Sequence, residues 1–300
     1  MTTQSAKALL LSRMEGLRQM PTIPAVLQPL LSYLELPTEQ VDVHRVTEMI
    51  AQDKALAAQC LQMANSPLFG RWQKIESLKS AVVALGVQRV SHIAMSCSVL
   101  NLLPTELGGI NPVVFWEHSL GCALACRHLA RQISAPDPGK VYLAGLLHDI
   151  GIVLNLWVLP EEFQNAYDLA RAEGLPLHEA EDRVLGFTHA ESGALLAERW
   201  ELPADLQETI LLHHGNGGSA QHSELIAMVE ICDLLCRMSG LNYGFIEKRE
   251  VNLLKQSAVA VLSRRYPDLE KLDWARLTFE LEAYMDEVHS LVHAVYRKGS

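Results

Sequence analysis

The sequence has few aromatic residues and no strongly basic segment, and both absences exclude classes of protein. Aromatic side chains make up only 6% of the chain, whereas hydrophobic residues of all kinds make up 49%. A folded core must therefore be built mainly from aliphatic side chains, as in packed helices. No run of Lys or Arg is longer than two, and the formal net charge is −10. Because binding a phosphate backbone needs clustered cations, we expect no direct contact with nucleic acid.

The sequence also lacks the features of secreted and membrane proteins. No apolar run approaches the roughly 20 residues that span a bilayer, and the N-terminus has no basic segment followed by an apolar stretch. We therefore expect a cytoplasmic protein without membrane contact. The six cysteines include no Cys-x-x-Cys pair. Cys122 and Cys126 are one helical turn apart, as are Cys232 and Cys236, and this spacing favours buried free thiols.

No segment alternates like a half-buried strand, and apolar residues recur at helical spacing almost everywhere, which predicts an all-α protein. Helices are expected near residues 6–18, 23–34, 43–50, 54–64, 77–85, 87–103, 112–133, 139–148, 160–173, 176–185, 189–199, 203–214, 221–239, 251–264 and 270–296. Pro104, Gly108, Gly109 and Pro112 interrupt this pattern. The interruption predicts two packed lobes: an N-terminal helical bundle at 1–108 and a second helical lobe at 109–300.

Polar residues of the second lobe fall among apolar neighbours, inside or at the ends of predicted helices. They are His118, the adjacent pair His148 and Asp149, His189, the adjacent pair His213 and His214, and Asp233. Imidazoles and carboxylates carried into an apolar bundle need partners, since burying them alone is costly. A divalent cation satisfies many such groups together, and helical bundles build metal sites from facing side chains. The alternative stays open that each histidine is a core residue bonded to a carbonyl and that the lobe is structural and metal-free.

The order of these residues resembles the HD superfamily of metal-dependent phosphohydrolases. This resemblance implies a first metal site formed by His118, His148, Asp149 and Asp233. His189 and the pair His213 and His214 are similar to those of the HD-GYP cyclic-di-GMP phosphodiesterases, which implies a second site that shares Asp149 as a bridge. One or two divalent ions are then expected, and mixed imidazole and carboxylate ligation suits iron or manganese, with zinc and nickel as alternatives.

Two departures from the HD-GYP pattern concern the substrate. Those enzymes carry a lysine three residues after the motif aspartate, where this chain has Ile152. After the double histidine they carry a Gly-Tyr-Pro loop, where this chain has Gly-Asn-Gly-Gly-Ser at 215–219. Lys140 and Arg183 are the cations nearest to the motifs along the chain, and neither occupies the motif position. Without such a cation, phosphoryl transfer loses charge stabilisation.

The first lobe carries a more specific resemblance. The string Gln52-Asp53-Lys54-Ala55-Leu56 leads to Met63-Ala64-Asn65-Ser66-Pro67-Leu68-Phe69-Gly70, and residues 75–86 then end in Leu-Gly. An acidic turn, a helix ending in Asn-Ser and a further helix ending in Leu-Gly resemble the signature of the HDOD family (HD-related output domain). The second-lobe strings at 145–151 and 187–194 are similar to the same family. The resemblance covers roughly residues 18–290.

The HDOD resemblance implies a bacterial signal-transduction output or adaptor module that retains a mono- or dinuclear metal site with little or no catalysis. Its partners would be other signalling proteins, such as cyclic-di-GMP turnover or two-component proteins. The alternative is a metal-dependent phosphohydrolase that acts on a nucleotide or cyclic dinucleotide. Glu181 has two readings, a partner that orients His189 or a solvated glutamate of a helix face, and we favour the second. His178 is expected at the surface.

Overall fold

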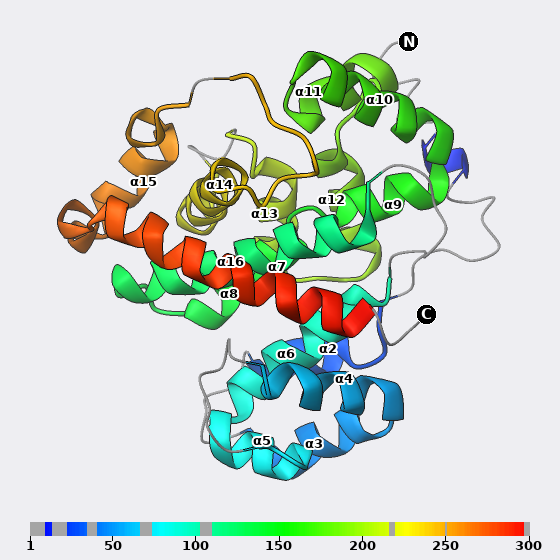
Figure 1. The fold of residues 1–300 in the computed structure, drawn as a ribbon, viewed down its shortest axis with the longest axis vertical. Helices are drawn as coiled ribbons and strands as arrows, with labels where there is room; N and C mark the ends of the chain where they lie inside the picture. The colour runs from blue at the N-terminus through cyan, green and yellow to red at the C-terminus, as the bar shows by residue number, and fades with distance from the viewer. Residues whose placement is uncertain are drawn as a thin grey trace. The chain divides into compact units, whose positions relative to one another are not determined.

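A computed structural model describes residues 10–13, 23–34, 41–66, 74–102, 110–215, 220–249 and 251–296, and helices are the only regular elements in these ranges. The predicted all-α class is confirmed. The chain forms two compact units (Figure 1), Pro104–Thr278 with Met1–Thr22, and Ile23–Leu103 with Phe279–Ser300. The units are therefore not a simple division of the chain at residue 108. The predicted boundary between residues 108 and 109, most of the expected helix 6–18, the string 67–70 and residues 216–219 of the expected loop lie outside the described residues.

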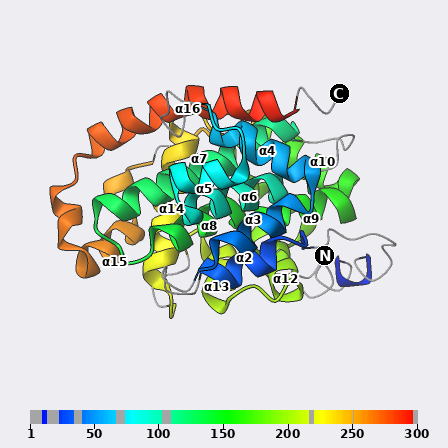
Figure 2. The same ribbon diagram turned by 90° about the horizontal axis from the view of Figure 1, so that it is seen from below.

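The unit of Ile23–Leu103 and Phe279–Ser300 is organised around one buried helix. Its helices are α2 (Leu27–Leu34), α3 (Val43–Ala51), α4 (Lys54–Ala64), α5 (Leu78–Leu85), α6 (Val87–Leu100) and the larger part of α16 (Trp274–Tyr296). The helices α2 to α5 all pack on α6 (Figure 2), which is buried on every side from Val90 to Leu100. Its hydroxyls at Ser96 and Ser98 bond to carbonyls four residues back, so they are satisfied within the helix.

The HDOD-like strings of this unit have local structural roles. Asp53 caps α4 by accepting hydrogen bonds from the backbone N–H groups of Ala55 and Leu56. Asn65, at the end of α4, donates to the carbonyl of Ile75 over 2.8 Å and accepts from its N–H over 2.7 Å. This exchange ties the end of α4 to the segment that leads into α5. Turn chemistry accounts for these residues without a ligand.

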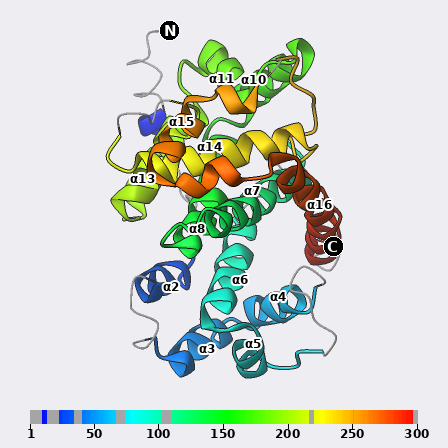
Figure 3. The same cartoon turned by 90° about the vertical axis from the view of Figure 1, so that its left-hand side faces the viewer.

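The unit of Pro104–Thr278 contains the predicted metal ligands. Its helices are α7 (Pro112–Gln132), α8 (Pro138–Leu147), α9 (Ile150–Val158), α10 (Pro160–Glu173), α11 (Leu177–Leu185), α12 (His189–Arg199), α13 (Ala204–Leu212), α14 (Ser223–Met238) and α15 (Ser257–Arg265), with the short 3-10 helices η3 (Leu253–Lys255) and η4 (Pro267–Lys271). α14 runs beside α7 and α8 (Figure 3), and α12 packs on α9. All six cysteines of the chain are buried and free, as expected.

One apolar stretch is longer than we expected from the sequence. Pro138–Val158 has 21 residues, and an 18-residue part of it has a mean hydropathy of 1.6. By length and composition this stretch could cross a membrane, so the expectation of no such run is wrong. It comprises α8 and α9, and 94% of the 18-residue part is buried inside the structure, as in the core of a folded domain. α9 was also missed as a helix. Eight of its nine residues are buried, so it has no polar face to create a helical period.

Candidate metal centre

Five of the seven predicted ligands lie at or next to helix ends, and the other two lie within helices. α8 ends at Leu147, and the chain turns through His148 and Asp149 before α9 begins at Ile150. His189 is the first residue of α12, which Thr188 and Glu191 start with a capping box. His213 follows the last residue of α13. His118 and Asp233 project from the middle of α7 and α14, two helices that pack together.

The first set of donors surrounds one point in the buried core. His118 Nε2 lies 3.3 Å from His148 Nε2 and 3.4 Å from Asp149 Oδ2. His148 Nε2 lies 3.2 Å from the same Asp149 oxygen. Asp233 Oδ1 completes the set, at 3.3 Å from His118 Nε2 and 3.9 Å from His148 Nε2. All four side chains are buried.

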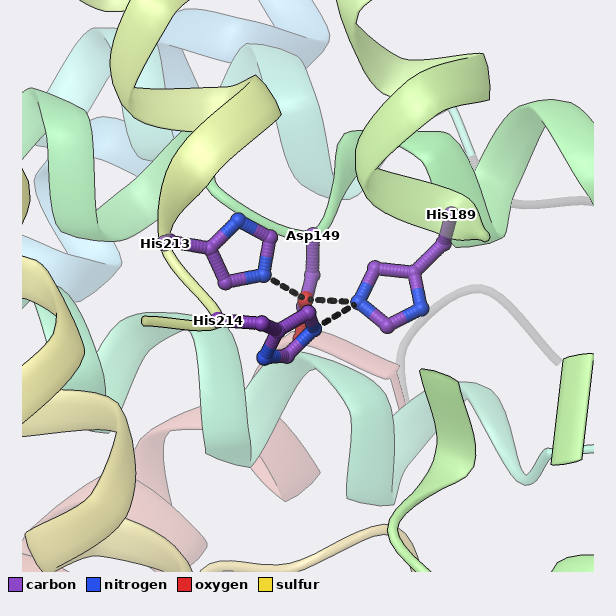
Figure 4. Close-up of side chains that lie close together, drawn as sticks. All are labelled: Asp149, His189, His213 and His214. Atoms are coloured by element: carbon purple, nitrogen blue, oxygen red, sulfur yellow. Dashed lines mark hydrogen bonds and ion pairs between the residues drawn. The ribbon is translucent and has the colours of Figure 1, made fainter. Parts of the chain in front are cut away.

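The second set lies on the other oxygen of Asp149 (Figure 4). His189 Nε2 is 3.1 Å from Asp149 Oδ1, and His213 Nε2 is 3.5 Å from it. His214 Nε2 lies 2.8 Å from His189 Nε2, so the two nitrogens share either a proton or a cation. Asp149 is therefore placed between the two sets, with one carboxylate oxygen directed at each.

The donor set fits a pair of metal ions. Ligand atoms that share one ion at about 2.1 Å lie about 3.0–3.4 Å from one another, which is close to the separations found here. In addition, Asp149 Oδ1 and His213 Nε2 are buried without a hydrogen-bond partner. Leaving such atoms unsatisfied costs about 1–3 kcal/mol each, so the core is built for something that satisfies them. The assignment of these seven residues as ligands stays a prediction.

The other ring nitrogen of four of these histidines is held by a hydrogen bond. The Nδ1 atoms of His118, His148 and His213 lie 2.7–2.8 Å from the carbonyls of Leu241, Gly145 and Ile210. Such contacts fix the tautomer and turn each Nε2 toward the centre, as is usual for metal-ligating histidines.

Glu181 holds the fourth histidine and corrects our expectation of a solvated glutamate. Its side chain is fully buried, and its Oε2 lies 2.6 Å from His189 Nδ1 and accepts from the His189 N–H over 2.7 Å. The amide of Asn155 donates to its other oxygen over 3.2 Å. A carboxylate with both oxygens bonded in the core orients His189 and makes it a stronger donor.

The charges of the cluster move its pKa values in opposite directions. Burial opposes protonation of the histidines, but the charge of Asp149 raises the pKa of His148 to about 9. Burial likewise opposes protonation of His189, but Glu181 and Asp149 raise its pKa to about 10. Burial would raise the pKa of Asp149, but His148 and His189 hold it well below its usual range. Without metal, protons therefore occupy part of the site that cations would fill.

Two residues that we did not predict from the sequence, Arg237 and Tyr243, contact the carboxylates of the first set. The guanidinium of Arg237 forms two hydrogen bonds to Asp233, at 3.0 and 2.9 Å, and two to Glu247, at 2.6 and 2.9 Å. The hydroxyl of Tyr243 donates to Asp149 Oδ2 and lies 3.4 Å from His118 Nε2. Arg237 follows Asp233 by one helical turn, a signal that the sequence did offer.

A cavity of about 310 Å³ reaches the second set of donors. His213, His214 and Asp233 line it, and so do Glu230, Arg237, Glu247 and Arg249. His178 also lines it and stacks on His214 with ring centroids 4.0 Å apart, so its expected place at the surface is wrong. Burial, followed by the charge of His189, lowers the pKa of His178 to about 3, so this imidazole is neutral.

Comparison with known proteins identifies the family. A model of the HDOD domain matches residues 20–216. The chain belongs to the HDOD family. The crystal structure of an HDOD domain protein with unknown function from Geobacter sulfurreducens is similar with a TM-score of 0.84 and 28% identity, covering 97% of this chain and 98% of that one.

Two curated relatives are longer than this chain. An uncharacterized protein of Treponema pallidum is 25% identical over 239 residues, which are 78% of this chain and 45% of the relative. The uncharacterized protein YuxH of Bacillus subtilis is 32% identical over 121 residues, which are 40% of this chain and 29% of the relative. The matched parts of this HDOD chain thus span less than half the length of either relative.

The two cations that we considered from the sequence of this HDOD chain, Lys140 and Arg183, pair with carboxylates that are not proposed metal ligands. Lys140 pairs with Asp205 at 2.7 Å, and Arg183 pairs with Glu173 at 3.1 Å among half-exposed side chains. Ile152, at the position of the HD-GYP lysine, is fully buried in the core. The cation that the structure places at the donors is Arg237 instead, and its guanidinium is already held by two carboxylates.

Proposed function

We propose that this chain is a signal-transduction output module with a dinuclear metal centre and little or no catalysis. It acts in the cytoplasm through contacts with other signalling proteins, such as those of cyclic-di-GMP turnover or two-component systems. Family membership supports the signalling role. The observation that carries the metal centre is Asp149, whose Oδ2 faces His118 and His148 while its Oδ1 faces His189 and His213.

The first ion is held by His118, His148, Asp149 and Asp233, and the second by Asp149, His189, His213 and His214. Imidazole and carboxylate donors suit iron or manganese, and also zinc or nickel. When bound, such a pair supplies Lewis acidity and an activated water. The protein itself contributes fixed imidazole orientations, through the carbonyls at Nδ1 and through Glu181.

The cavity beside the second set supports the absence of efficient phosphoryl chemistry. The described residues that line it include the carboxylates of Glu230, Asp233 and Glu247 and two guanidiniums, those of Arg237 and Arg249. Arg237 is bound to Asp233 and Glu247, and Arg249 pairs with Glu179 at 3.3 Å. Because both guanidiniums are already paired, the side chains add little positive charge for a phosphate beyond that of the proposed metal ions, and its transition state gains little stabilisation from them.

The metal content of Asp149→Ala tests the proposal. Asp149 is the only ligand proposed for both ions, so this variant should lose both, whereas the wild-type protein purified without an affinity tag should carry them. Asp182→Ala, which removes an exposed aspartate of α11, is the matched control and should keep the full complement. The measurement is elemental analysis of protein with an unchanged helical circular dichroism spectrum. A full metal complement in Asp149→Ala would show that the bridging assignment is wrong.

The second candidate function is a metal-dependent phosphohydrolase, favoured by the cavity that reaches His213 and His214. Protein purified anaerobically with iron or manganese is assayed on bis(p-nitrophenyl) phosphate and on cyclic-di-GMP, with chromatography of the products. We expect weak hydrolysis of the aryl diester at most. Cyclic-di-GMP turnover should be absent or orders of magnitude below about 10 per second, because the cavity offers no free cation to position two phosphates. Turnover near 1 per second that is lost in His148→Ala would overturn the output-module proposal.

A further inference from the structure

The segment 241–247, which follows α14, crosses the first set of donors and touches three of its parts. The carbonyl oxygen of Leu241 lies 2.7 Å from His118 Nδ1. The hydroxyl of Tyr243 contacts Asp149. Glu247 binds Arg237, which in turn holds Asp233. A single short segment therefore positions an imidazole, the bridging carboxylate and the terminal carboxylate of the same half of the centre.

Tyr243 is the member of this segment that reaches the donors directly. Its side chain is 3% exposed, and its ring centroid lies 4.8 Å from that of His118. Its hydroxyl donates to Asp149 Oδ2, the oxygen that faces the first set, and lies 3.4 Å from His118 Nε2. The phenolic oxygen thus lies against two of the donors of the first ion, the bridging carboxylate and an imidazole.

The backbone holds Tyr243 in this place. The hydroxyl of Tyr167 donates to the Tyr243 carbonyl over 2.9 Å. The next residue, Gly244, has φ +90°, a left-handed conformation that a side chain would disfavour. Further on, the N–H of Lys248 donates to the carbonyl of Gly174 over 2.8 Å. The phenol is therefore fixed from both sides rather than free to swing toward solvent.

We propose that Tyr243 is a ligand of the first metal ion and binds it as a phenolate, its proton passing to solvent on coordination. This inference rests on the metal centre of the proposed function. The first ion then has five protein donors: His118, His148, Asp149, Asp233 and Tyr243. A set with three anionic oxygen donors suits a hard, trivalent ion, so ferric iron is the class of metal expected in this half.

With a phenolate ligand on the first ion, the two ions differ in how easily water and other exogenous ligands reach them. Five protein donors leave the first ion little room for water. One proposed ligand of the first ion, Asp233, lines the cavity, as do two proposed ligands of the second ion, His213 and His214. A first ion crowded by five protein donors beside a more accessible second ion suits structure or sensing rather than the two-metal activation of a nucleophile.

The visible spectrum of the ferric protein tests this inference, because a phenolate bound to ferric iron gives a charge-transfer band that imidazole and carboxylate ligands do not. Wild-type protein is loaded with iron, oxidised and compared with Tyr243→Phe. Tyr142→Phe is the control, since it removes the phenol of another buried tyrosine, one that stacks with Arg127 at 5.3 Å. We expect the band in the wild type and in Tyr142→Phe, and its loss in Tyr243→Phe. Resonance Raman spectra of the wild type alone should show tyrosinate modes, which keeps the test valid if Tyr243→Phe does not fold.

Elemental analysis of the same samples separates the two proposals. Wild-type protein that holds two ferric ions without a charge-transfer band would leave the metal centre standing and overturn the phenolate ligand. Tyr243 would then only position Asp149 by its hydrogen bond. A band of full intensity in Tyr243→Phe would overturn it as well. Wild-type protein that binds no metal would overturn both this inference and the proposed function.

Discussion

Single residues of the centre differ in which of their atoms are already satisfied. The Nδ1 atoms of His118, His148 and His213 face backbone carbonyls, so only their Nε2 atoms are directed at the cluster. Both oxygens of Glu181 are bonded, whereas Asp149 keeps one oxygen without a hydrogen bond. The side chains of the site thus divide into proposed metal ligands and residues that orient those ligands. Glu181 belongs to the second kind.

At this scale we predict that metal stabilises the protein more at about pH 9 than at about pH 6.5. In the folded metal-free protein the pKa values of His148 and His189 are about 9 and about 10, above their value of about 6.5 in an unfolded chain. Their raised pKa stabilises the metal-free fold fully below about pH 6.5, and this stabilisation is lost as the pH rises toward 9 and 10. Metal must displace a proton from both histidines at about pH 6.5, whereas at about pH 9 about half of the His148 side chains have already lost theirs, so binding costs less.

The measurement is the difference in melting temperature between metal-loaded and chelator-treated protein at the two pH values. Asp149→Ala serves as the control, because without its bridging carboxylate it should show no metal-dependent difference at either pH. An equal or larger effect of metal at the lower pH would contradict the assignment of these histidines as ligands.

Among the helices, the close crossing of α9 and α12 brings Asp149 to His189. Gly151 lies in the first turn of α9, and a Cβ added there would lie 1.8 Å from the carbonyl oxygen of His189 and 2.6 Å from the backbone nitrogen of Gly193. Glycine at 151 and 193 lets the two backbones touch. The second set of donors therefore depends on the separation of two helices as much as on its own residues.

We predict that Gly151→Ala destabilises the protein by about 3 kcal/mol and lowers the occupancy of the second ion, because backbone atoms of α12 cannot yield to the new methyl group. Gly121→Ala is the matched control. Its Cβ would lie 2.2 Å from Leu241 Cδ1, the end of a flexible side chain that can rotate. Thermal unfolding and elemental analysis measure both effects. A Gly151→Ala protein with wild-type stability and two bound ions would show that α9 and α12 can accommodate a methyl group where they cross.

For the molecule as a whole, strings typical of the family occur in both compact units, but the proposed ligands lie in one of them. The seven predicted ligands and Tyr243 belong to Pro104–Thr278, whereas Asp53, Asn65 and the Leu-Gly string belong to Ile23–Leu103. In the unit of Ile23–Leu103 these residues cap helices and fix turns. The family strings of that unit therefore have structural roles, and the proposed metal centre lies in the other unit.

We predict that metal protects only the unit that binds it. A ligand at 100 times its dissociation constant stabilises the state that binds it by about 2.7 kcal/mol. Hydrogen exchange measured by mass spectrometry, with metal and with chelator, should show slower exchange in α7, α9, α12 and α14 upon metal binding. Exchange in α3 to α6 should change little, which makes these helices an internal control. Equal protection of α3 to α6 would show that the two units unfold as one.

The helical class and six of the buried polar residues could be predicted from the sequence. Apolar spacing at the helical period predicts most helices, because most of them have one solvated face. It failed for α9, which has no such face. The seven candidate ligands could be named because His and Asp among apolar neighbours are costly to bury and so stand out in the sequence.

The family resemblance already implied two sets of ligands, but which other side chains join them depends on the tertiary structure. Glu181 reaches His189 because α11 and α12 pack together, and Tyr243 reaches Asp149 across 94 positions of the chain. The same holds for Arg237, which is held by Asp233 one turn away and by Glu247 from the segment after α14. Contacts of this kind depend on helix packing and on backbone turns, and neither leaves a period in the sequence from which it can be predicted.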